Sequence, residues 1–572
     1  MTPMPRALII CGLFLIALGV RFLTWQDNRR DIWKIQTSVT QGYKDSARQL
    51  AGGDFKLFVS DINHMGHPPG YPILLAGIFK TFGESDTAIQ VVQIFLDGLA
   101  VILVFLIAAE LAPLGAAVLC GFLAAISPQF AYFPIVLLPD SLVVPPILLA
   151  ILLLIRGREK PHLANFAIAG ALIGLSCLLR ANALLLPFFL ALLTPLFVPR
   201  GKRLHAAAAL VAGALLTIAP VTIKNAIVFR SFIPLSLGAG QTFLEGIADY
   251  DDAKRFNIPD TDLGIMRQEA EWYGNPEYAL LLFGRDGVKR DRMRVGRGLA
   301  VVRSHPVWFA GVVAKRGLAS TRLDPVPVLR PTSPVSHDLP LFDVPELERR
   351  LEGGPDKYGA LYVSDAMTVK PNTDYVLLLA LKLERGRVQI VITDAQQQRV
   401  LASTQVDLVE GVNDQPVHNL TIPFVSGSNT QVRFVVSNFA SENSSVLMGT
   451  SPGGPIELGP SSYQWLRYVR QPLGFVQRFF KTAWVLPFVV IGLFLMVRKR
   501  NWQSLAILLA VPAYYLVVQS TLHTERRYVY IIHFFFLILA SEALCKIATR
   551  TYAFAAGFFA THKPDTPNGR FM

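Results

Sequence analysis

Long apolar runs separated by polar segments recur along most of the 572-residue chain. Clear examples lie at residues 7–20, 88–109, 142–155 and 486–497. A helix needs roughly 20 apolar residues to cross a bilayer, and several of these runs approach or exceed that length. The pattern therefore predicts a polytopic α-helical membrane protein with about 10–12 transmembrane helices.

Each predicted span combines an apolar run with polar residues at its ends. The spans lie near residues 7–23, 88–109, 113–132, 135–155, 163–180, 182–198, 206–223, 481–497, 503–520 and 528–545. An external loop separates the first two spans, and a larger external region separates the seventh from the eighth. No small-residue cleavage site follows the first run, so we expect it to be retained as a span rather than removed as a signal peptide.

Residues 356–455 follow a different pattern, in which short β-rich stretches such as RVQIVITDA and TQVRFVVSNFA alternate with turn residues. This spacing predicts a small antiparallel β-sandwich within the extracytoplasmic region, which can bind carbohydrate, dock a partner or brace the active face. Tyr358, Tyr362 and Tyr375 are its candidate sugar-stacking aromatics. The competing interpretation is that they are core or edge residues, which is the commoner role of tyrosine in a small sandwich.

These patterns divide the chain into four parts. Residues 1–223 are predicted to form an N-terminal transmembrane core with the first external loop. Residues 224–355 form an extracytoplasmic region of mixed helical pattern, and residues 356–455 form the sandwich. Residues 456–572 supply the C-terminal transmembrane helices and a cytoplasmic tail. Within the second part, VWFAGVVAKRGLA (307–319) is typical of an amphipathic helix on a membrane surface.

Composition agrees with a membrane protein, since 52% of the residues are hydrophobic, only 17% are charged and the mean hydropathy is +0.41. The net charge of +13 is explained by topology rather than by nucleic-acid binding. Basic clusters at 156–160, 200–203, 498–500 and 546–550 follow predicted spans and fall on one side, as the positive-inside rule requires. The four cysteines lie in apolar spans, and we expect no disulfide.

Unusual polar residues gather on the opposite, external side of the predicted topology. They are Asp45, Asp61, His64, His67, Asp140, Arg180, Lys224, Asn225, His523, Glu525, Arg526 and Arg527. Singly, they suit interfacial anchors, or a helix N-cap in the case of Asp140. Together, acids and cations at span ends favour a functional cavity. Cations bind a lipid-linked phosphate and a carboxylate acts as a base, so the set indicates chemistry on such a phosphate.

Several segments carry a family resemblance. PVTIKNAIVFRSFIPLSLGAGQTFLEG (220–246) resembles a motif of bacterial membrane glycosyltransferases of the C superfold, the group of protein mannosyltransferases and lipid A aminoarabinose transferases. Lys224 stands where the family commonly has arginine. YKDSARQLAGGDF with GHPPGYPILLAGIFKTFG is similar to the family's first external loop. LPDSLVVPPILLAILLL resembles its acidic span start, and ERRYVYIIHFFFLIL resembles its Arg-Tyr before the final span.

The resemblance implies an inverting glycosyltransferase that moves a hexosyl or pentosyl unit from a polyprenyl-phosphate donor to a cell-envelope glycan, lipid or protein. It implies a multi-pass protein of the bacterial cytoplasmic (inner) membrane with an extracytoplasmic active face, and no nucleic-acid partner. No cofactor is required, because the donor bond is already activated. The alternative is a catalytically silent glycan-binding or assembly protein of the same fold. A lipid-linked sugar transporter is less favoured, because transporters bind substrate at the midplane.

The catalytic acid is where the chain departs from the family. In the family, the acid of this loop stands four residues before a tyrosine, and a small residue stands four residues after that tyrosine. Tyr43 and Ala47 match the tyrosine and the small residue. The position of the acid is occupied by Val39. Asp45, expected on another helix face from Tyr43, and Asp61 are the rival candidates for the base, and Asp31 is a third.

The remaining site predictions concern charge and metal. Asp140 is a second cavity acid by resemblance. Lys224, Arg526, Arg527 and Arg180 are predicted to contact the donor phosphate. Further cavity residues are Tyr43, His64, His67, Asn225, His523 and Glu525. No metal-ligand pattern is evident, although His64 and His67 near Asp61 leave a divalent cation as a minor alternative.

Overall fold

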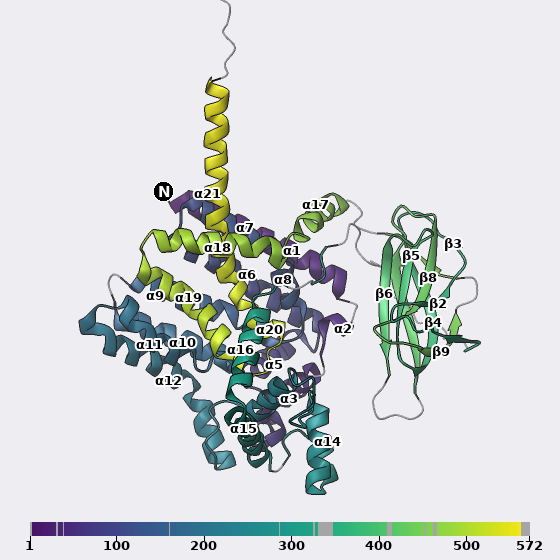
Figure 1. Ribbon diagram of the computed structural model, residues 1–572, viewed down its shortest axis with the longest axis horizontal. Coiled ribbons are helices and arrows are strands. Elements are labelled where there is room, and N and C mark those ends of the chain that lie inside the picture. The colour runs from purple at the N-terminus through teal and green to yellow at the C-terminus, as the bar shows by residue number, and fades with distance from the viewer. Residues whose placement is uncertain are drawn as a thin grey trace, which may run out of the picture. The chain divides into compact units, whose positions relative to one another are not determined.

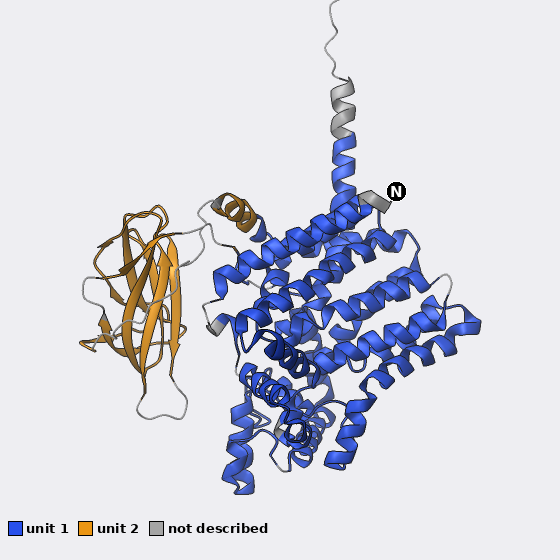
Figure 2. Ribbon diagram, turned by 180° about the vertical axis from the view of Figure 1, so that it is seen from behind, with its two compact units in different colours: residues 1–328, 476–572 blue, residues 329–475 orange. Residues whose placement is uncertain are grey.

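The structure is a computed structural model that describes residues 3–29, 32–37, 39–158, 161–284, 286–323, 326–329, 347–408, 415–450, 454–461 and 466–561. Two compact units are present, one formed by residues 1–328 with 476–572 and the other by residues 329–475 (Figure 2). Each unit is described by itself below.

The first unit is a helical bundle (Figure 1). Its helices are α1 (Pro3–Asn28), α2 (Ile32–Ile35), α3 (Thr40–Gly52), α4 (Phe55–Ser60), α5 (Gly70–Phe82), α6 (Asp86–Leu111), α7 (Leu114–Ile126), α8 (Pro128–Tyr132), α9 (Val144–Gly157), α10 (Leu163–Leu179), α11 (Leu186–Phe197), α12 (Arg203–Phe229), α13 (Ala239–Ala248), α14 (Asp262–Tyr273), α15 (Gly287–Ser304), α16 (Pro306–Ser320), α18 (Thr482–Arg498), α19 (Trp502–Val517), α20 (Arg526–Val529) and α21 (Ile531–Thr561). The start of α1 and the far part of α21 lie at one end of the bundle, and α3, α14 and α15 lie toward the other.

Among the described residues, six helices are long and apolar enough to cross a membrane. They begin at Arg6, Asp86, Pro139, Arg200, Trp502 and Ile531. Two further candidates are bent pairs, of which α7 with the segment 128–135 bends by 50°. Gly70–Phe82, Leu163–Leu179 and Ala181–Phe197 are shorter apolar helices. The prediction of a polytopic helical membrane protein is confirmed, and breaks at Pro128 and before α9 explain why some predicted spans are shorter or bent.

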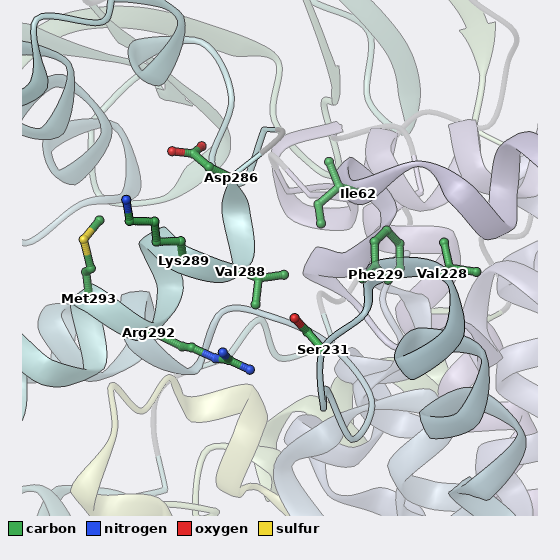
Figure 3. Close-up of a pocket in the computed structure, with 9 residues that line it drawn as sticks. All are labelled: Ile62, Val228, Phe229, Ser231, Asp286, Val288, Lys289, Arg292 and Met293. Atoms are coloured by element: carbon green, nitrogen blue, oxygen red, sulfur yellow. The ribbon is translucent and has the colours of Figure 1, made fainter.

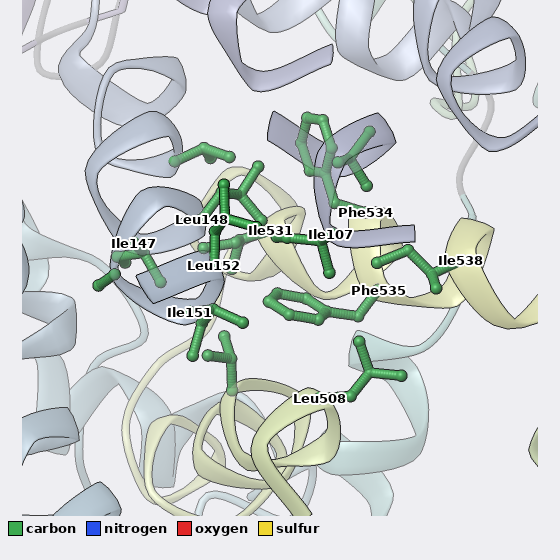
Figure 4. Close-up of a cluster of buried hydrophobic side chains, with 14 of the residues drawn as sticks. Ile107, Ile147, Leu148, Ile151, Leu152, Leu508, Ile531, Phe534, Phe535 and Ile538 are labelled. Atoms are coloured by element: carbon green, nitrogen blue, oxygen red, sulfur yellow. The ribbon is translucent and has the colours of Figure 1, made fainter. Parts of the chain in front are cut away.

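The centre of the bundle is packed almost entirely with branched and aromatic apolar side chains (Figure 4). On α9, Ile147, Leu148, Ile151 and Leu152 are buried, and Ala150, Leu154 and Ile155 extend the buried surface around more than half of the helix. They share one core with side chains of α6, α19 and α21, namely Ile107, Leu508, Ile531, Phe534, Phe535 and Ile538. A helix buried on all sides is typical of the interior of a membrane bundle.

The apolar segment after GHPPGYP forms α5, a 13-residue helix inside the predicted first external loop. Tyr71 and Leu75 of α5 pack with Tyr43 and Ala47 of α3 in one buried cluster. At the start of α5, a Cβ on Gly70 would lie 2.5 Å from the carbonyl oxygen of Leu178, at the end of α10. Only glycine permits this approach, which brings the loop histidines close to Arg180.

Helices α13 to α16 form a separate layer held by buried charges. Arg290 and Arg294 of α15 both bind Glu269 of α14, with nitrogen–oxygen distances of 2.6 to 2.9 Å, and all three are buried. Charge-assisted hydrogen bonds of this kind pair buried charged groups that water does not reach. The layer therefore has a fixed shape next to the loop that follows α12.

The second unit contains two antiparallel sheets, as the sequence predicted. Their strands are β1 (Arg349–Glu352), β2 (Ala360–Val363), β3 (Met367–Thr368), β4 (Thr373–Arg385), β5 (Arg387–Asp394), β6 (Val400–Asp407), β7 (Val417–Val425), β8 (Gln431–Asn438), β9 (Ser445–Thr450) and β10 (Ile456–Pro460). One sheet has the order β1-β9-β4-β10 with β7 also paired to β4, and the other β2-β8-β5-β6 with β3 paired to β8. Helix α17 (Arg467–Gln477) follows β10.

Alternating apolar residues from both sheets form one core. On β8, Val432, Phe434 and Val436 are buried while the residues between them are partly exposed, which is the period-2 pattern of a half-buried strand. Leu379 of β4 lies opposite Leu420 of β7 and belongs to the same core as Val436. The strands run from residue 349 to 460, slightly beyond the predicted range of 356–455.

The three candidate sugar-stacking tyrosines differ in their accessibility. Tyr375 is buried, stacks on Phe424 at 5.6 Å and accepts a hydrogen bond from the Lys370 amide, so it is a core residue and cannot stack on a sugar. Tyr362 is partly buried against Phe434. Tyr358 is exposed and is the one of the three whose ring is open to solvent.

Candidate functional site

A cavity of about 470 Å³ lies where α3, the GHPPGYP turn and the end of α12 converge. We call it the α3–α12 cavity. Its lining residues are Val39, Gly42, Tyr43, Asp45, Ser46, Phe58, His64, Met65, His67, Pro69, Pro72, Ile73, Pro220, Val221, Lys224 and Leu235. Five of the predicted site residues therefore share one cavity: Tyr43, Asp45, His64, His67 and Lys224.

An aromatic stack forms one part of the cavity wall. The His67 ring stacks on Tyr43 with a centroid distance of 4.5 Å, and Tyr43 meets Tyr71 edge-on at 5.0 Å. Burial raises the pKa of Tyr43 to about 12 although the positive charges of Arg180 and Arg527 oppose the rise, so its hydroxyl stays protonated at neutral pH. Tyr71 is held in turn by a 2.7 Å hydrogen bond from its hydroxyl to Gln93 of α6. The stack is thus a rigid, uncharged surface.

His67 is neutral at physiological pH for two physical reasons. Burial and then the positive charges of Arg180 and Arg527 lower the pKa of His67 to about 4, below its ordinary value of about 6.5. The imidazole therefore offers the cavity one hydrogen-bond donor and one acceptor, without adding positive charge.

This shift predicts acid sensitivity of the fold. The unfolded chain binds a proton at His67 below about pH 6.5 whereas the folded chain does not until about pH 4, so the stabilisation is complete above pH 6.5 and is lost as the pH falls toward 4. We expect the melting temperature of the purified protein to fall over this window, and to fall less steeply in His67→Phe, which keeps the ring stack. Replacing the exposed His162 by Phe is the control. Identical slopes in His67→Phe and the parent protein would contradict the assignment.

Asp45 is the carboxylate that lines the α3–α12 cavity. Its side chain is about half exposed, accepts a 3.1 Å hydrogen bond from Gln41 and pairs with Arg48. Arg48 also binds Glu84, at nitrogen–oxygen distances of 2.7 to 3.1 Å. Tyr43 is buried and Asp45 is half exposed, as expected for residues two apart on a helix, yet both are among the residues that line the cavity.

Asp61 is not among the residues that line the cavity. It caps the end of α4, and its carboxylate is 4.0 Å from Nε2 of His64, too far for a hydrogen bond. His64 itself lines the cavity, and its Nδ1 is buried without a hydrogen-bond partner. Of these two acids, the carboxylate of Asp45 is therefore the one that lines the cavity.

Lys224 and Asn225 have different environments although they are adjacent on α12. The ammonium of Lys224 lies in the α3–α12 cavity, 3.6 Å from the Met65 sulfur. Asn225 is fully buried and donates to the carbonyls of Ile233 and Leu235 at 3.0 and 3.1 Å. Asn225 thus closes the loop that follows α12 and is not among the residues that line the cavity, contrary to its predicted place there.

A charged cluster stands beside the cavity, formed by Asp140, Arg180, Glu525, Arg527 and Tyr528; we call it the Asp140 cluster. Nη1 of Arg180 lies 2.7 and 2.8 Å from the two carboxylate oxygens of Asp140, and its guanidinium lies 4.0 Å from the centre of the Tyr528 ring. Arg527 and the Tyr528 hydroxyl both donate to Oε1 of Glu525, at 2.5 and 2.8 Å. Asp140 is therefore engaged in positioning Arg180.

Arg527 retains unused hydrogen-bonding capacity. Its Nε and Nη1 are buried and have no hydrogen-bond partner, while Nη2 is held by Glu525. A buried guanidinium with unused donors fits an oxyanion such as a phosphate. Burial alone would raise the pKa of Glu525, but Arg527 and Tyr528 hold it below its ordinary value, so Glu525 remains an anion that fixes Arg527.

Arg526 and His523 lie outside these groups. Arg526 lines a different pocket. Its side chain diverges from that of Arg527 because adjacent residues on a helix point about 100° apart. His523 is paired with Asp249 at 2.7 Å, and its amide bonds to Thr242 of α13. Neither residue is therefore among those that line the α3–α12 cavity, where His523 was predicted to lie.

A more open groove of about 670 Å³ runs between the end of α12 and the start of α15 (Figure 3). Phe229 and Ser231 line one side, and Asp286, Lys289 and Arg292 line the other. None of the predicted site residues lines it. Its two cations are exposed and solvated, so the groove lacks the convergent buried polar groups that mark the α3–α12 cavity.

Tyr528 and Ser46 are site residues that the sequence did not single out. Tyr528 was visible in ERRYVY, since an aromatic ring beside arginines is a common partner for a guanidinium. Within the described ranges, no group of three or more histidine, cysteine, aspartate or glutamate side chains is arranged to hold a metal ion.

Comparisons with known proteins agree with the resemblance. Residues 66–223 match the family model for dolichyl-phosphate-mannose-protein mannosyltransferase. This confirms, over those residues, the predicted similarity to membrane glycosyltransferases. The matched stretch runs from the GHPPGYP turn to the residue before Lys224, and includes Asp140 and Arg180. No match among proteins of curated function was found.

The solved structures that are similar to this chain include those of three glycosyltransferases. The archaeal oligosaccharyltransferase AglB from Archaeoglobus fulgidus, in complex with an inhibitory peptide and a dolichol-phosphate, has 14% identity and a TM-score of 0.43, covering 98% of this chain and 52% of its own. ArnT from Cupriavidus metallidurans bound to undecaprenyl phosphate has 13% identity, a TM-score of 0.31 and coverage of 57% and 66%. Arabinosyltransferase EmbB from Mycobacterium smegmatis has 12% identity, a TM-score of 0.24 and coverage of 78% and 64%. The chain spans about half the length of AglB.

Proposed function

We propose that this protein is an inverting glycosyltransferase that moves a sugar from a polyprenyl-phosphate donor to an acceptor of the cell envelope. The observation that carries the proposal is the α3–α12 cavity, which joins a carboxylate, a lysine and the neutral imidazole of His67 beside the unused donors of Arg527. The family match over residues 66–223 supports it. We place the reaction at the outer face of a bacterial inner membrane, with a glycan, lipid or protein as acceptor.

The geometry supports a division of roles between the two charged groups. The acceptor hydroxyl oxygen attacks the anomeric carbon, and its proton passes to the carboxylate of Asp45. The bond between the anomeric carbon and the phosphate oxygen breaks, and its electron pair remains on the phosphate. Lys224 and Arg527 stabilise this developing charge, because preorganised cations act most strongly where charge appears in the transition state. Asp140 is the positioning residue for Arg180.

A silent binding or assembly protein is the second candidate, and one observation favours it. Val39, at the position where the family has its acid, lines the cavity, and the nearby Asp45 is engaged by Arg48. Such a protein would keep the cavity and lack turnover.

The test is transfer in proteoliposomes that contain the purified protein, a lipid-linked sugar donor and envelope acceptor, with glycosylated product and released polyprenyl phosphate both measured. We expect equal amounts of the two. Lys224→Met and Arg527→Gln should each lower the turnover rate by about tenfold or more, since each removes a cation from the leaving phosphate. The matched control is Lys289→Met, which changes an exposed cation of the open groove between the end of α12 and the start of α15. Absence of turnover with folded protein across several donors would favour the silent alternative.

A further inference from the structure

A second polar pocket, of about 190 Å³, lies on the elements that carry the Asp140 cluster. We call it the α16–α21 pocket. Its lining residues are Gln129, Asp249, Tyr250, Arg316, Ala319, Ser320, Arg322, Thr524, Glu525, Arg526, Val529 and His533. Arg526 and Val529 line it, whereas Arg527 and Tyr528 belong to the Asp140 cluster, so the short segment 525–529 contributes to both sites.

Buried polar atoms without partners surround this pocket. Arg316, Gln129 and His533 are each at most 4% exposed. Nε of Arg316, Oε1 of Gln129 and both ring nitrogens of His533 have no partner at hydrogen-bonding geometry. Buried polar groups in folded proteins are nearly always satisfied by protein, water or a ligand. Three such side chains around one hollow therefore indicate a place that polar molecules occupy.

Arg316 is fixed as part of the pocket wall. Its Nη1 donates to the carbonyls of Ser520 and Leu522, both at 2.8 Å, and its Nη2 donates to the carbonyl of Gly246. The guanidinium also lies 5.0 Å from the centre of the Tyr250 ring. Because these contacts hold the side chain in place, its Nε is a preorganised donor rather than a mobile one.

The charged residues of the pocket suit two kinds of ligand group: hydroxyl groups and an acidic group. Asp249 and Glu525 are carboxylates whose bonded partners, His523 and Arg527, are not lining residues. Both carboxylates repel a free phosphate, but they accept hydrogen bonds from hydroxyl groups, as Oε1 of Gln129 does. Arg322 and Arg526 are exposed guanidiniums, which bind a carboxylate or phosphate substituent. A ligand that uses both sets carries hydroxyls and one acidic group.

The volume limits the size of that ligand. About 190 Å³ corresponds to about six water molecules at roughly 30 Å³ each. This space suits a single monosaccharide, so the other residues of a longer chain would lie outside it.

We propose that the α16–α21 pocket binds one acidic sugar residue, with its hydroxyls on Gln129, Asp249 and Glu525 and its acidic group on Arg322 and Arg526. Binding itself follows from the pocket alone. The role of this residue as part of the acceptor, bound while its neighbour reacts in the α3–α12 cavity, rests on the proposed function. Glu525 links the two sites, because it lines this pocket and also holds Arg527.

The experiment measures binding to the full-length protein in detergent, with no donor present, by saturation-transfer NMR. The probes are methyl β-glucuronide and methyl β-glucoside, which differ only at the carboxylate, and inorganic phosphate. We expect the glucuronide to bind at least about tenfold more tightly than the glucoside. Gln129→Leu and Arg322→Ala should each weaken glucuronide binding by a similar factor. Lys289→Ala, an exposed cation elsewhere, should not change it.

Three outcomes would overturn the proposal. Equal binding of the two glycosides removes the acidic group from the assignment. Phosphate that binds as tightly as the glucuronide and competes with it indicates a simple anion site. Binding of no probe by folded protein indicates a water-filled pocket. Because no donor is used, loss of sugar transfer with intact glucuronide binding would reject the proposed function and leave this pocket assignment standing.

Discussion

Asp45→Asn is expected to lower the rate of sugar transfer by about 10²- to 10⁴-fold, the usual contribution of a general base. Asparagine keeps the shape of the side chain and its acceptor oxygen, but it cannot take the proton of the attacking hydroxyl. Among the candidate acids, Asp45 lines the α3–α12 cavity, Asp61 is not among its lining residues, Asp140 is held by Arg180, and Asp31 lies outside the described residues. Donor binding should change little, because the phosphate contacts come from other residues.

Val39 makes a sharper version of this test possible. It lines the same cavity and stands where the family resemblance places the acid. In the Asp45→Asn background, Val39→Asp should restore transfer by about tenfold or more, since it returns a carboxylate to the cavity. Product formation with a lipid-linked donor is the measurement.

Glu84→Gln is the matched control for Asp45→Asn. Glu84 binds the same Arg48 but does not line the cavity, so its loss disturbs the surface network without removing the base. We expect transfer within about twofold of the parent protein in this variant. Full activity in Asp45→Asn, with loss in Asp61→Asn, would instead assign the base to Asp61 acting through His64.

The class of the protein and many of its elements were predictable because each depends on local sequence. Apolar runs mark helices such as α6 and α9, and strict alternation marks strands such as β8, since burial on one face follows from periodicity alone. The gathering of Tyr43, His67 and Lys224 in one cavity was also foreseen, from the side of the membrane to which each was assigned. These predictions needed topology but no knowledge of side-chain contacts.

The failures concern side chains whose roles depend on distant partners. Arg526 and Arg527 are equivalent in sequence, and only the turn of α20 sends Arg526 to the α16–α21 pocket and Arg527 to the Asp140 cluster. Asn225 resembles a cavity residue until the loop after α12 brings two carbonyls to its amide. Asp140 and Arg180 are 40 residues apart, so their pairing requires the packing of α9 beside α10. Such pairings are set by tertiary contacts and leave no local periodicity.

Arg21 and Asp97 form an ion pair that hydropathy alone concealed, because each is a single charge within a long apolar helix. Both are fully buried, in α1 and α6, with Nε and Nη2 of Arg21 at 2.7 and 2.6 Å from Oδ2 of Asp97. A Cβ on the adjacent Gly98 would lie 2.7 Å from the Phe14 ring, so the two helices are in close contact there. A charge left alone at such a site has no water to solvate it.

Arg21→Leu is therefore expected to destabilise the protein by about 3 to 5 kcal/mol, the usual cost of breaking a buried ion pair by removing one partner. The measurement is thermal unfolding of the detergent-solubilised protein, with the fraction of monodisperse protein as a second readout. The double variant Arg21→Leu with Asp97→Leu should recover most of the loss, since no unpaired charge remains. The matched control is Arg156→Leu, which breaks an exposed interhelical pair with Glu110 of α6 and should cost about 0 to 1 kcal/mol. If Arg21→Leu costs no more than Arg156→Leu, or if the double variant is no better than the single one, then the pair does not hold α1 against α6 and the close approach at Gly98 must suffice.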